Sequence, residues 1–159
     1  MRHIVAALAL LALLPGCKGT DVASNIAAPA KTLAVTIEGA GGRHRFDVER
    51  ATTKEEQAQG LMYRTDLTPQ GGMLFWPYPP DGGAPVEASF WMKNTPTSLD
   101  IIFIRADGTI ARIADNTTPF SDAPIASGEP IAAVLELVGG RTAELGIGEG
   151  DRVTWPGRK

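Results

Sequence analysis

The sequence predicts a single, mostly β domain, built as a compact barrel or sandwich with one or two short helices. Three observations predict this class: glycine (18 residues) and proline (12 residues) are abundant, the apolar runs are short, and many of them alternate with polar residues. Short alternating runs between turn-forming residues are typical of strands rather than of a helical bundle. A length of 159 residues is enough for one domain.

Residues 1–16 have the pattern of a secretory signal peptide. A basic start precedes the apolar run Ile4–Leu14, which is too short to span a bilayer. Cys17 follows Gly16 directly and is the only cysteine, an arrangement that resembles the lipid-attachment site of bacterial lipoproteins. The alternative is a plain secretory signal that leaves Cys17 as a free thiol. A single cysteine excludes an intramolecular disulfide and a cysteine-based metal site.

The N-terminal pattern also predicts where the protein acts. We expect residues 17–30 to be the lipidated cysteine and a flexible tether, and residues 31–159 to be the globular domain. Several acyl chains on Cys17 would anchor the protein stably to a membrane of the cell envelope, with the domain facing the periplasm.

The first elements of the domain are a predicted hairpin and a helix. Leu33–Glu38 alternates apolar and polar residues, Gly39–Gly42 is a turn, and Phe46–Val48 belongs to the returning strand. Thr52–Glu56 matches a capping box, in which a threonine is followed three residues later by a glutamate. We therefore expect a short helix that ends at Gly60.

The middle of the domain is organised around a polar turn between two strands. Met73–Trp76 is a short apolar strand, and the proline-rich loop Pro77–Pro85 is either a lid, a partner surface or a plain connection. Val86–Phe90 alternates and leads into the turn Lys93–Ser98. Leu99–Ile104 is apolar nearly throughout, as expected of a strand that is covered on both faces.

The last part of the domain is predicted to contain further strands, a long loop and one helical turn. The loop is rich in proline, serine and aspartate, and loops of that length are usually functional or mobile. In chain order we expect a hairpin turn at Ala106–Gly108, a strand at Thr109–Ile113, the loop at Asn116–Pro130, a strand at Ile131–Val138, the helical turn at Thr142–Leu145 and a strand at Val153–Trp155.

Several short motifs along the chain are those of a known family. They are Gly60-Leu61-Met62-Tyr63-Arg64, Gly72-Met73-Leu74-Phe75, Phe90-Trp91-Met92-Lys93-Asn94-Thr95, Leu99-Asp100-Ile101-Ile102-Phe103, Asp107-Gly108, Val134-Leu135-Glu136-Leu137, Gly146-Ile147 and Gly150-Asp151. With these motifs the chain resembles the domain of unknown function 192 family (DUF 192) from about Leu33 to Trp155. The resemblance implies a compact, mostly β, barrel- or sandwich-like domain, and it supplies no established activity.

Composition excludes several classes of function. A net charge of -3 without a basic patch excludes a nucleic-acid partner. His44 is the only histidine after the signal peptide, which is too few for a histidine-based zinc site and makes a Ser-His-Asp triad a remote alternative. Neither a glycine-rich phosphate loop nor the spacing of a calcium loop occurs. We therefore expect no cofactor and no metal.

The remaining candidate for a site is a set of polar and aromatic residues near the central turn. A charge buried in an apolar strand needs a partner. In a purely structural arrangement, Asp100 accepts hydrogen bonds from the backbone of the preceding turn and Arg64 pairs with Glu136. The candidate ligand-binding residues are Arg64, Trp91, Lys93, Asn94, Asp100 and Glu136.

Three functions are compatible with this set. The favoured one is a non-catalytic module that binds a small ligand or an envelope component, in which Lys93 or Arg64 holds an anionic group and Trp91 or Trp76 forms an apolar wall. The second is a hydrolase of a wall or envelope polymer that uses Asp100 and Glu136 as an acid/base carboxylate pair. The third is a scaffold without a ligand pocket.

Overall fold

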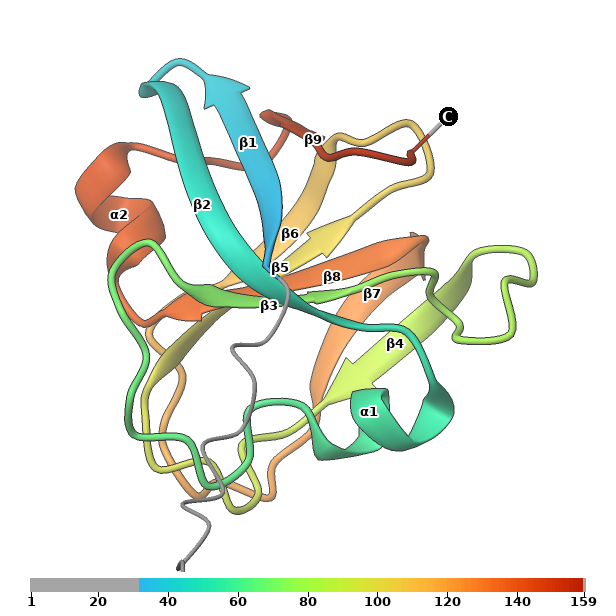
Figure 1. The fold of residues 1–159 in the computed structure, drawn as a ribbon, viewed down its shortest axis with the longest axis vertical. Coiled ribbons are helices and arrows are strands. Elements are labelled where there is room, and N and C mark those ends of the chain that lie inside the picture. Colours follow the sequence, from blue (N-terminus) through green and yellow to red (C-terminus); the bar gives the residue numbers. More distant parts are fainter. Residues whose placement is uncertain (1–31, 159) are drawn as a thin grey trace, which may run out of the picture.

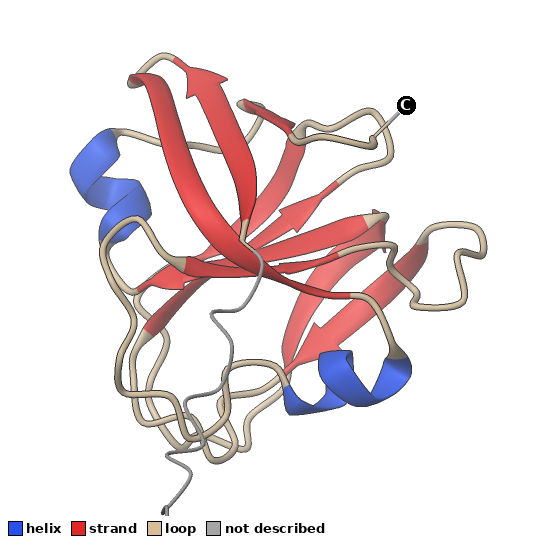
Figure 2. Cartoon of the chain, in the orientation of Figure 1, coloured by secondary structure: helices blue, strands red, loops and turns tan. Residues whose placement is uncertain are grey.

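The computed structural model describes residues 32–158, which form nine strands and two short helices (Figures 1 and 2). The predicted signal peptide, Cys17 and the tether lie outside these residues and stay predictions. In the part of the chain that is described, no helix is long and apolar enough to cross a membrane. The mostly β, barrel-like fold class is confirmed.

Seven of the strands form one curved sheet. They are β1 (Leu33–Gly39), β2 (Gly42–Ala51), β3 (Gly72–Phe75), β5 (Leu99–Ile104), β6 (Ile110–Ala114), β8 (Ala133–Val138) and β9 (Arg152–Thr154). Their order across the sheet is β6-β5-β8-β3-β2-β1-β9, and every pair is antiparallel except β2 with β3. A single bridge between Thr109 and Arg152 joins the two edges, so the sheet is nearly closed into a barrel.

The other two strands, β4 (Val86–Phe90) and β7 (Ile125–Ile131), form a small sheet beside the barrel (Figure 1). β7 corrects the prediction of a loop over Asn116–Pro130. Its sequence contains Gly128 and Pro130, which weaken the sequence pattern of a strand. Because β7 pairs only with β4, a proline without an N–H group is tolerated there.

The two helices lie on opposite sides of the molecule (Figure 2). α1 (Lys54–Gln59) lies beside the small sheet. α2 (Arg141–Leu145) follows the C-terminal end of β8. Both occur where the sequence predicts a short helix, and both end at a glycine with a positive φ angle, Gly60 and Gly146.

Two hydrophobic cores meet at β5, whose six residues are all buried. Ile102 and Ile104 point into the barrel core, whereas Ile101 and Phe103 point into a second core on the outer face of the barrel sheet. The prediction that this strand is covered on both faces is therefore confirmed. The second core also contains residues of the small sheet, such as Ala88, and it is the one that borders the candidate site.

A capping box holds the start of α1, as the sequence predicts. The backbone N–H of Glu56 donates to Thr53 Oγ1 (3.1 Å), and Glu56 Oε2 accepts from the backbone N–H of Thr53 (3.0 Å). Backbone N–H groups of Thr52 and Thr53 hold the pKa of the Glu56 carboxyl below its usual range.

Replacing Thr53 with alanine is expected to lower the free energy of unfolding by about 1 kcal/mol, because one N–H group at the helix start loses its acceptor. Urea melting measures this change. Glu55→Gln is the control, since Glu55 is an exposed neighbour outside the capping box. Equal losses in the two variants would contradict a specific capping role for Thr53.

Candidate functional site

Glu136 is a buried residue, and one oxygen of its carboxyl group has no hydrogen-bond partner in the described part of the chain. It lies in β8 between Met73 of β3 and Ile101 of β5, and only 4% of its surface is exposed. Its Oε2 atom has no hydrogen-bond partner within residues 32–158. Burial in this apolar environment raises the pKa of the group from an ordinary 4.5 to about 8. At neutral pH the side chain is therefore mostly the uncharged acid.

A cavity of about 30 Å³ lies against Glu136, and we call it the niche. Gln57 also lines it, and Gln57 Nε2 donates hydrogen bonds to Pro77 O (2.8 Å) and Ala51 O (3.2 Å). These two carbonyls fix the orientation of the amide, so that Gln57 Oε1 is held as an acceptor. That oxygen is buried and has no partner in the described part of the chain. The apolar lining comes mainly from Leu61, Phe75, Phe90 and Trp91.

Gly60 allows the end of α1 to close over the niche. Its φ angle is +49°, a conformation that residues with a side chain rarely adopt. A Cβ atom at this position would lie 3.1 Å from the ring of Phe75 and 3.9 Å from Glu136 Oε2. The glycine in the Gly60–Arg64 motif therefore serves both the turn and the close approach of the backbone to the carboxyl group.

A larger groove of about 660 Å³ adjoins the niche, between α1, β4 and the loop that follows β3. The groove and the niche share four lining residues, Gln57, Ala58, Phe90 and Trp91. Lys54 and Asp81 are the charged residues that line the groove. The niche is thus a small polar recess beside a hollow of the size of a ligand site.

Aromatic rings form much of the wall of these two hollows. The Phe90 ring packs edge-to-face against Phe75, with ring centres 5.3 Å apart, and lies 5.9 Å from the ring of Tyr78. Trp91 is 50% exposed and lines both hollows. An apolar or aromatic part of a ligand would find flat surfaces here.

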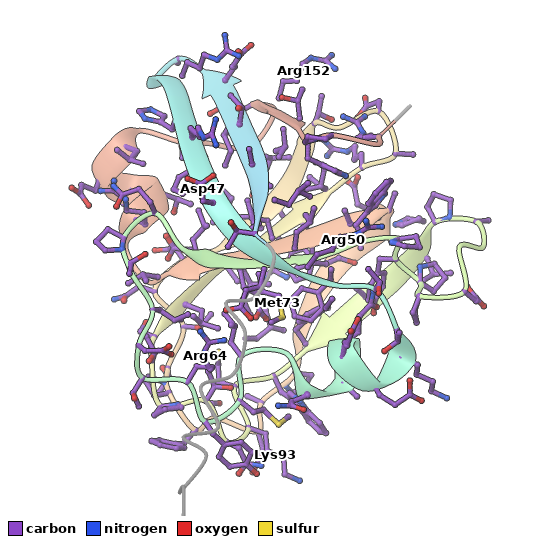
Figure 3. The ribbon with its side chains drawn as sticks, in the orientation of Figure 1. Asp47, Arg50, Arg64, Met73, Lys93 and Arg152 are labelled. Atoms are coloured by element: carbon purple, nitrogen blue, oxygen red, sulfur yellow. The ribbon has the colours of Figure 1, made fainter. Side chains whose placement is uncertain are left out.

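Lys93 and Asn94 lie next to this site and line neither the groove nor the niche. Lys93 Nζ lies 5.2 Å from the centre of the Trp91 ring, within range of a cation–π contact. Figure 3 shows Lys93 at the lower end of the molecule. Asn94 has a φ angle of +56°, and its carbonyl accepts from the N–H of Tyr63 (2.8 Å), so its observed role is in the turn itself.

Arg64 is paired with two carboxylates other than Glu136. Its Nη1 donates to Glu49 Oε1 (2.8 Å) and its Nε donates to Asp66 Oδ1 (2.7 Å), and these hydrogen bonds raise the pKa of its guanidinium group. Arg64 lines another hollow together with Glu49 and Met73. The predicted pair with Glu136 is wrong because these two carboxylates hold the guanidinium group outside the niche.

Asp100 is fully buried and accepts four hydrogen bonds. Its Oδ1 accepts from the N–H groups of Asn116 (2.7 Å) and Gly140 (2.8 Å), and its Oδ2 accepts from the N–H (2.7 Å) and the hydroxyl (2.8 Å) of Thr142. The predicted acceptor role is confirmed, but its donors are not those of the preceding turn. One donor, Asn116, follows β6, and the others belong to Gly140 and Thr142 at the start of α2. The start of α2 is close because the start of β5 lies beside the end of β8.

Asp100 and Glu136 lie on opposite faces of the barrel sheet. Asp100 is directly opposite Leu137, whereas Glu136 is directly opposite Ile101. Residues directly opposite one another share a face, and successive residues alternate between faces. The two carboxyl groups therefore cannot act on one substrate, and the hypothesis of a hydrolase built on this pair is wrong.

Of the six predicted residues, the structure brings Trp91 and Glu136 together at the niche. Gln57, Tyr78 and Phe90 were not predicted as site residues. Of these three residues, only Tyr78 lies in a segment that the sequence marks as a possible site, the proline-rich loop. Within residues 32–158, no group of three or more histidine, cysteine, aspartate or glutamate side chains is placed to hold a metal ion.

Two solved structures are similar to this chain along most of its length. One is a protein of unknown function from Novosphingobium aromaticivorans DSM 12444, with 43% identity over 82% of this chain and 89% of that chain and a TM-score of 0.75. The other, from Sinorhizobium meliloti 1021, is provisionally described as a transcription regulator, with 40% identity over 80% of this chain and 96% of that chain and a TM-score of 0.73. A comparison with curated proteins finds no significant match.

The family comparison agrees with the motifs noted in the sequence. The model of the DUF192 family, described as uncharacterized ACR, COG1430, matches residues 35–155. This range extends from β1 to the residue after β9 and includes both Glu136 and the groove. The chain therefore belongs to the DUF192 family.

Proposed function

We propose that this protein is a non-catalytic binding module of the cell envelope whose small ligand occupies the groove and the niche. The observation that carries the proposal is the unpartnered carboxyl of Glu136 beside a hollow of ligand size. A buried polar atom without a partner costs about 1–3 kcal/mol, and most buried polar atoms have one. A ligand that supplies the missing partner offsets this cost, which favours binding at this place.

The size and lining of the groove support the same proposal. Its volume of about 660 Å³ lies within the usual range for small-molecule sites, and such sites combine mostly apolar walls with few polar groups. Here Tyr78, Phe90 and Trp91 form the apolar wall, and Gln57 and Glu136 supply polar groups. A scaffold without a ligand accounts for neither unpartnered oxygen.

Filling the groove tests the proposal. Ala58→Trp places a large side chain at an exposed position of α1 that lines both hollows, whereas Glu55→Trp places the same side chain on the same helix outside them. A panel of small aromatic, amine and sugar fragments is titrated into the three proteins and followed by amide and indole NMR signals. We expect at least one fragment to shift the signals of Gly60, Ser89 and Trp91 in the wild type and in Glu55→Trp, and none to do so in Ala58→Trp.

Two results would contradict the proposal. In one, no fragment of the panel perturbs these signals in the wild type. In the other, Ala58→Trp binds the same fragments with unchanged affinity, which places the binding surface elsewhere.

The envelope location is part of the proposal and is supported by the N-terminal sequence pattern. If Cys17 carries the lipid anchor, Cys17→Ser is expected to move the protein from the membrane fraction to the soluble periplasmic fraction, because no acyl chain can then be attached. Cell fractionation followed by immunoblotting measures this shift. Unchanged membrane retention of the serine variant would contradict lipid anchoring at Cys17.

A further inference from the structure

Four side chains with amide, hydroxyl or carboxyl groups line the niche, namely Gln57, Gln59, Thr95 and Glu136. Gln59 is exposed to solvent, whereas the other three are buried or half-buried and have acceptor capacity to spare. Gln57 Oε1 is fixed as an acceptor by the two bonds that its Nε2 makes. Thr95 donates its hydroxyl proton to Lys93 O (3.1 Å), so its oxygen can only accept further bonds. Glu136 Oε2 is unpartnered. A group that contacts these three acceptors must therefore donate hydrogen bonds.

The surroundings of the niche are favourable for a cation. The rings of Phe75, Phe90 and Trp91 line it, and aromatic faces attract ammonium groups. No other charged side chain in the described residues lines it, so nothing there repels a positive charge or competes for Glu136.

The charged and titratable groups around the niche belong to the adjoining hollows. Lys54 of α1 lines the groove, and so do Tyr78 and Asp81 of the loop after β3. Beyond the end of α1, Arg64 pairs with Glu49 of β2 and with Asp66. The elements that pack directly against Glu136 present apolar side chains: Met73 and Phe75 from β3, Ile101 from β5, and Phe90 from β4.

We propose that the niche binds the ammonium group of a primary amine whose aromatic or other apolar body lies in the groove. This inference rests on the proposed function and names the chemical class of its ligand. An ammonium group carries three N–H donors, one for each of the acceptors on Gln57, Thr95 and Glu136. A niche of about 30 Å³ has the volume that a water-sized group occupies, which suits a primary ammonium and is too small for a quaternary one.

Binding of an ammonium group also requires a change of protonation at Glu136. The carboxyl is neutral in the free protein at neutral pH, and an adjacent positive charge favours its ionised form. The carboxyl therefore releases one proton to solvent as the amine binds. A hydroxyl group needs no such release, because it accepts from neutral Glu136 and donates to Gln57.

Benzylamine and benzyl alcohol are matched probes for this difference, since they share the aromatic body and differ in the donor group. Titration calorimetry of the wild-type protein in phosphate and in Tris measures proton release. We expect benzylamine to bind with release of about one proton, and its affinity to rise about tenfold between pH ~6 and pH ~7 as Glu136 becomes easier to ionise. We expect benzyl alcohol to bind at least tenfold more weakly at pH ~7.5 and without proton release.

Glu136→Gln and Ala58→Trp separate the possible outcomes. Glu136→Gln should lose at least tenfold in affinity for benzylamine and keep its affinity for benzyl alcohol, and Ala58→Trp should bind neither probe. Equal binding of the two probes to the wild type, or amine binding without proton release, would overturn the ammonium assignment and leave the binding module intact. Absence of binding by both probes would overturn the ammonium site. Unchanged binding by Ala58→Trp would overturn both the ammonium site and the proposed function.

Discussion

Asp100→Ala is expected to lower the free energy of unfolding by roughly 4–8 kcal/mol, the largest effect of any single substitution considered for this domain. The change removes the acceptor of four donors: the buried N–H and hydroxyl of Thr142, and the partly buried N–H groups of Asn116 and Gly140. Each such donor costs about 1–3 kcal/mol, and the whole stability of a domain is only about 5–15 kcal/mol. The variant should therefore be partly or wholly unfolded at 37 °C, which circular dichroism and urea melting measure.

Two further variants define the cause of this loss. Asp100→Asn keeps one acceptor oxygen but directs an NH₂ group at other donors, so it should be destabilised by less than the alanine variant and by clearly more than the control. The control is Asp115→Ala, an exposed carboxylate in the same segment, which should change stability by less than about 0.5 kcal/mol. If Asp100→Ala melts within about 1 kcal/mol of the wild type, Asp100 does not join β5, α2 and the residues after β6 as described.

Glu136→Gln is expected to be more stable than the wild type at alkaline pH, because the wild type loses stability as Glu136 ionises. The pKa of Glu136 is raised from 4.5 in the unfolded chain to about 8 in the fold, so the fold favours the protonated acid. The stability that this group contributes is complete below pH ~4.5 and is lost as the pH rises through about 8. Glutamine keeps the shape of the neutral acid and does not titrate. At pH ~8.5 the variant should be more stable than the wild type by on the order of 4 kcal/mol, and near pH ~4 the two should be similar.

Thermal melting between pH ~4 and ~9 measures this difference, which corresponds to roughly 15 °C at the alkaline end. Glu87→Gln on the exposed side of β4 is the matched control and should follow the wild-type curve. A structural role for Glu136 predicts the opposite sign, namely a variant that is less stable at every pH. That outcome would mean that Glu136 has a partner that stabilises its ionised form.

Much of the fold was predictable from local patterns in the sequence. The alternation in β1 and β2, the capping box of α1 and the continuous apolar run of β5 each reflect one local rule, and each is confirmed. β7 was not predictable in this way, because its glycine and proline are typical of a loop and only its pairing with β4 makes it a strand. The parallel pairing of β2 with β3 depends likewise on contacts between distant parts of the chain.

The candidate site was only partly predictable, for the same reason. The apolar neighbours of Asp100 and Glu136 in the sequence indicate correctly that both carboxyl groups are buried. They do not indicate which of the two carboxyl groups has hydrogen-bond donors. Strand register decides that Asp100 meets the start of α2 and that Glu136 meets the apolar outer core, and register is a property of the assembled sheet. The fixed amide of Gln57 is also a result of tertiary contacts, here with the carbonyl of Pro77.

Glu136 is buried, and no other part of the described chain donates a hydrogen bond to its Oε2 atom. The most direct test is a titration of its side-chain carboxyl carbon by ¹³C NMR, assigned by comparison with Glu136→Gln. The structure predicts a midpoint near 8, because burial is the cause that acts on the group. A midpoint near the ordinary value of 4.5 would contradict the claim, since the ionised group would then be hydrated or paired.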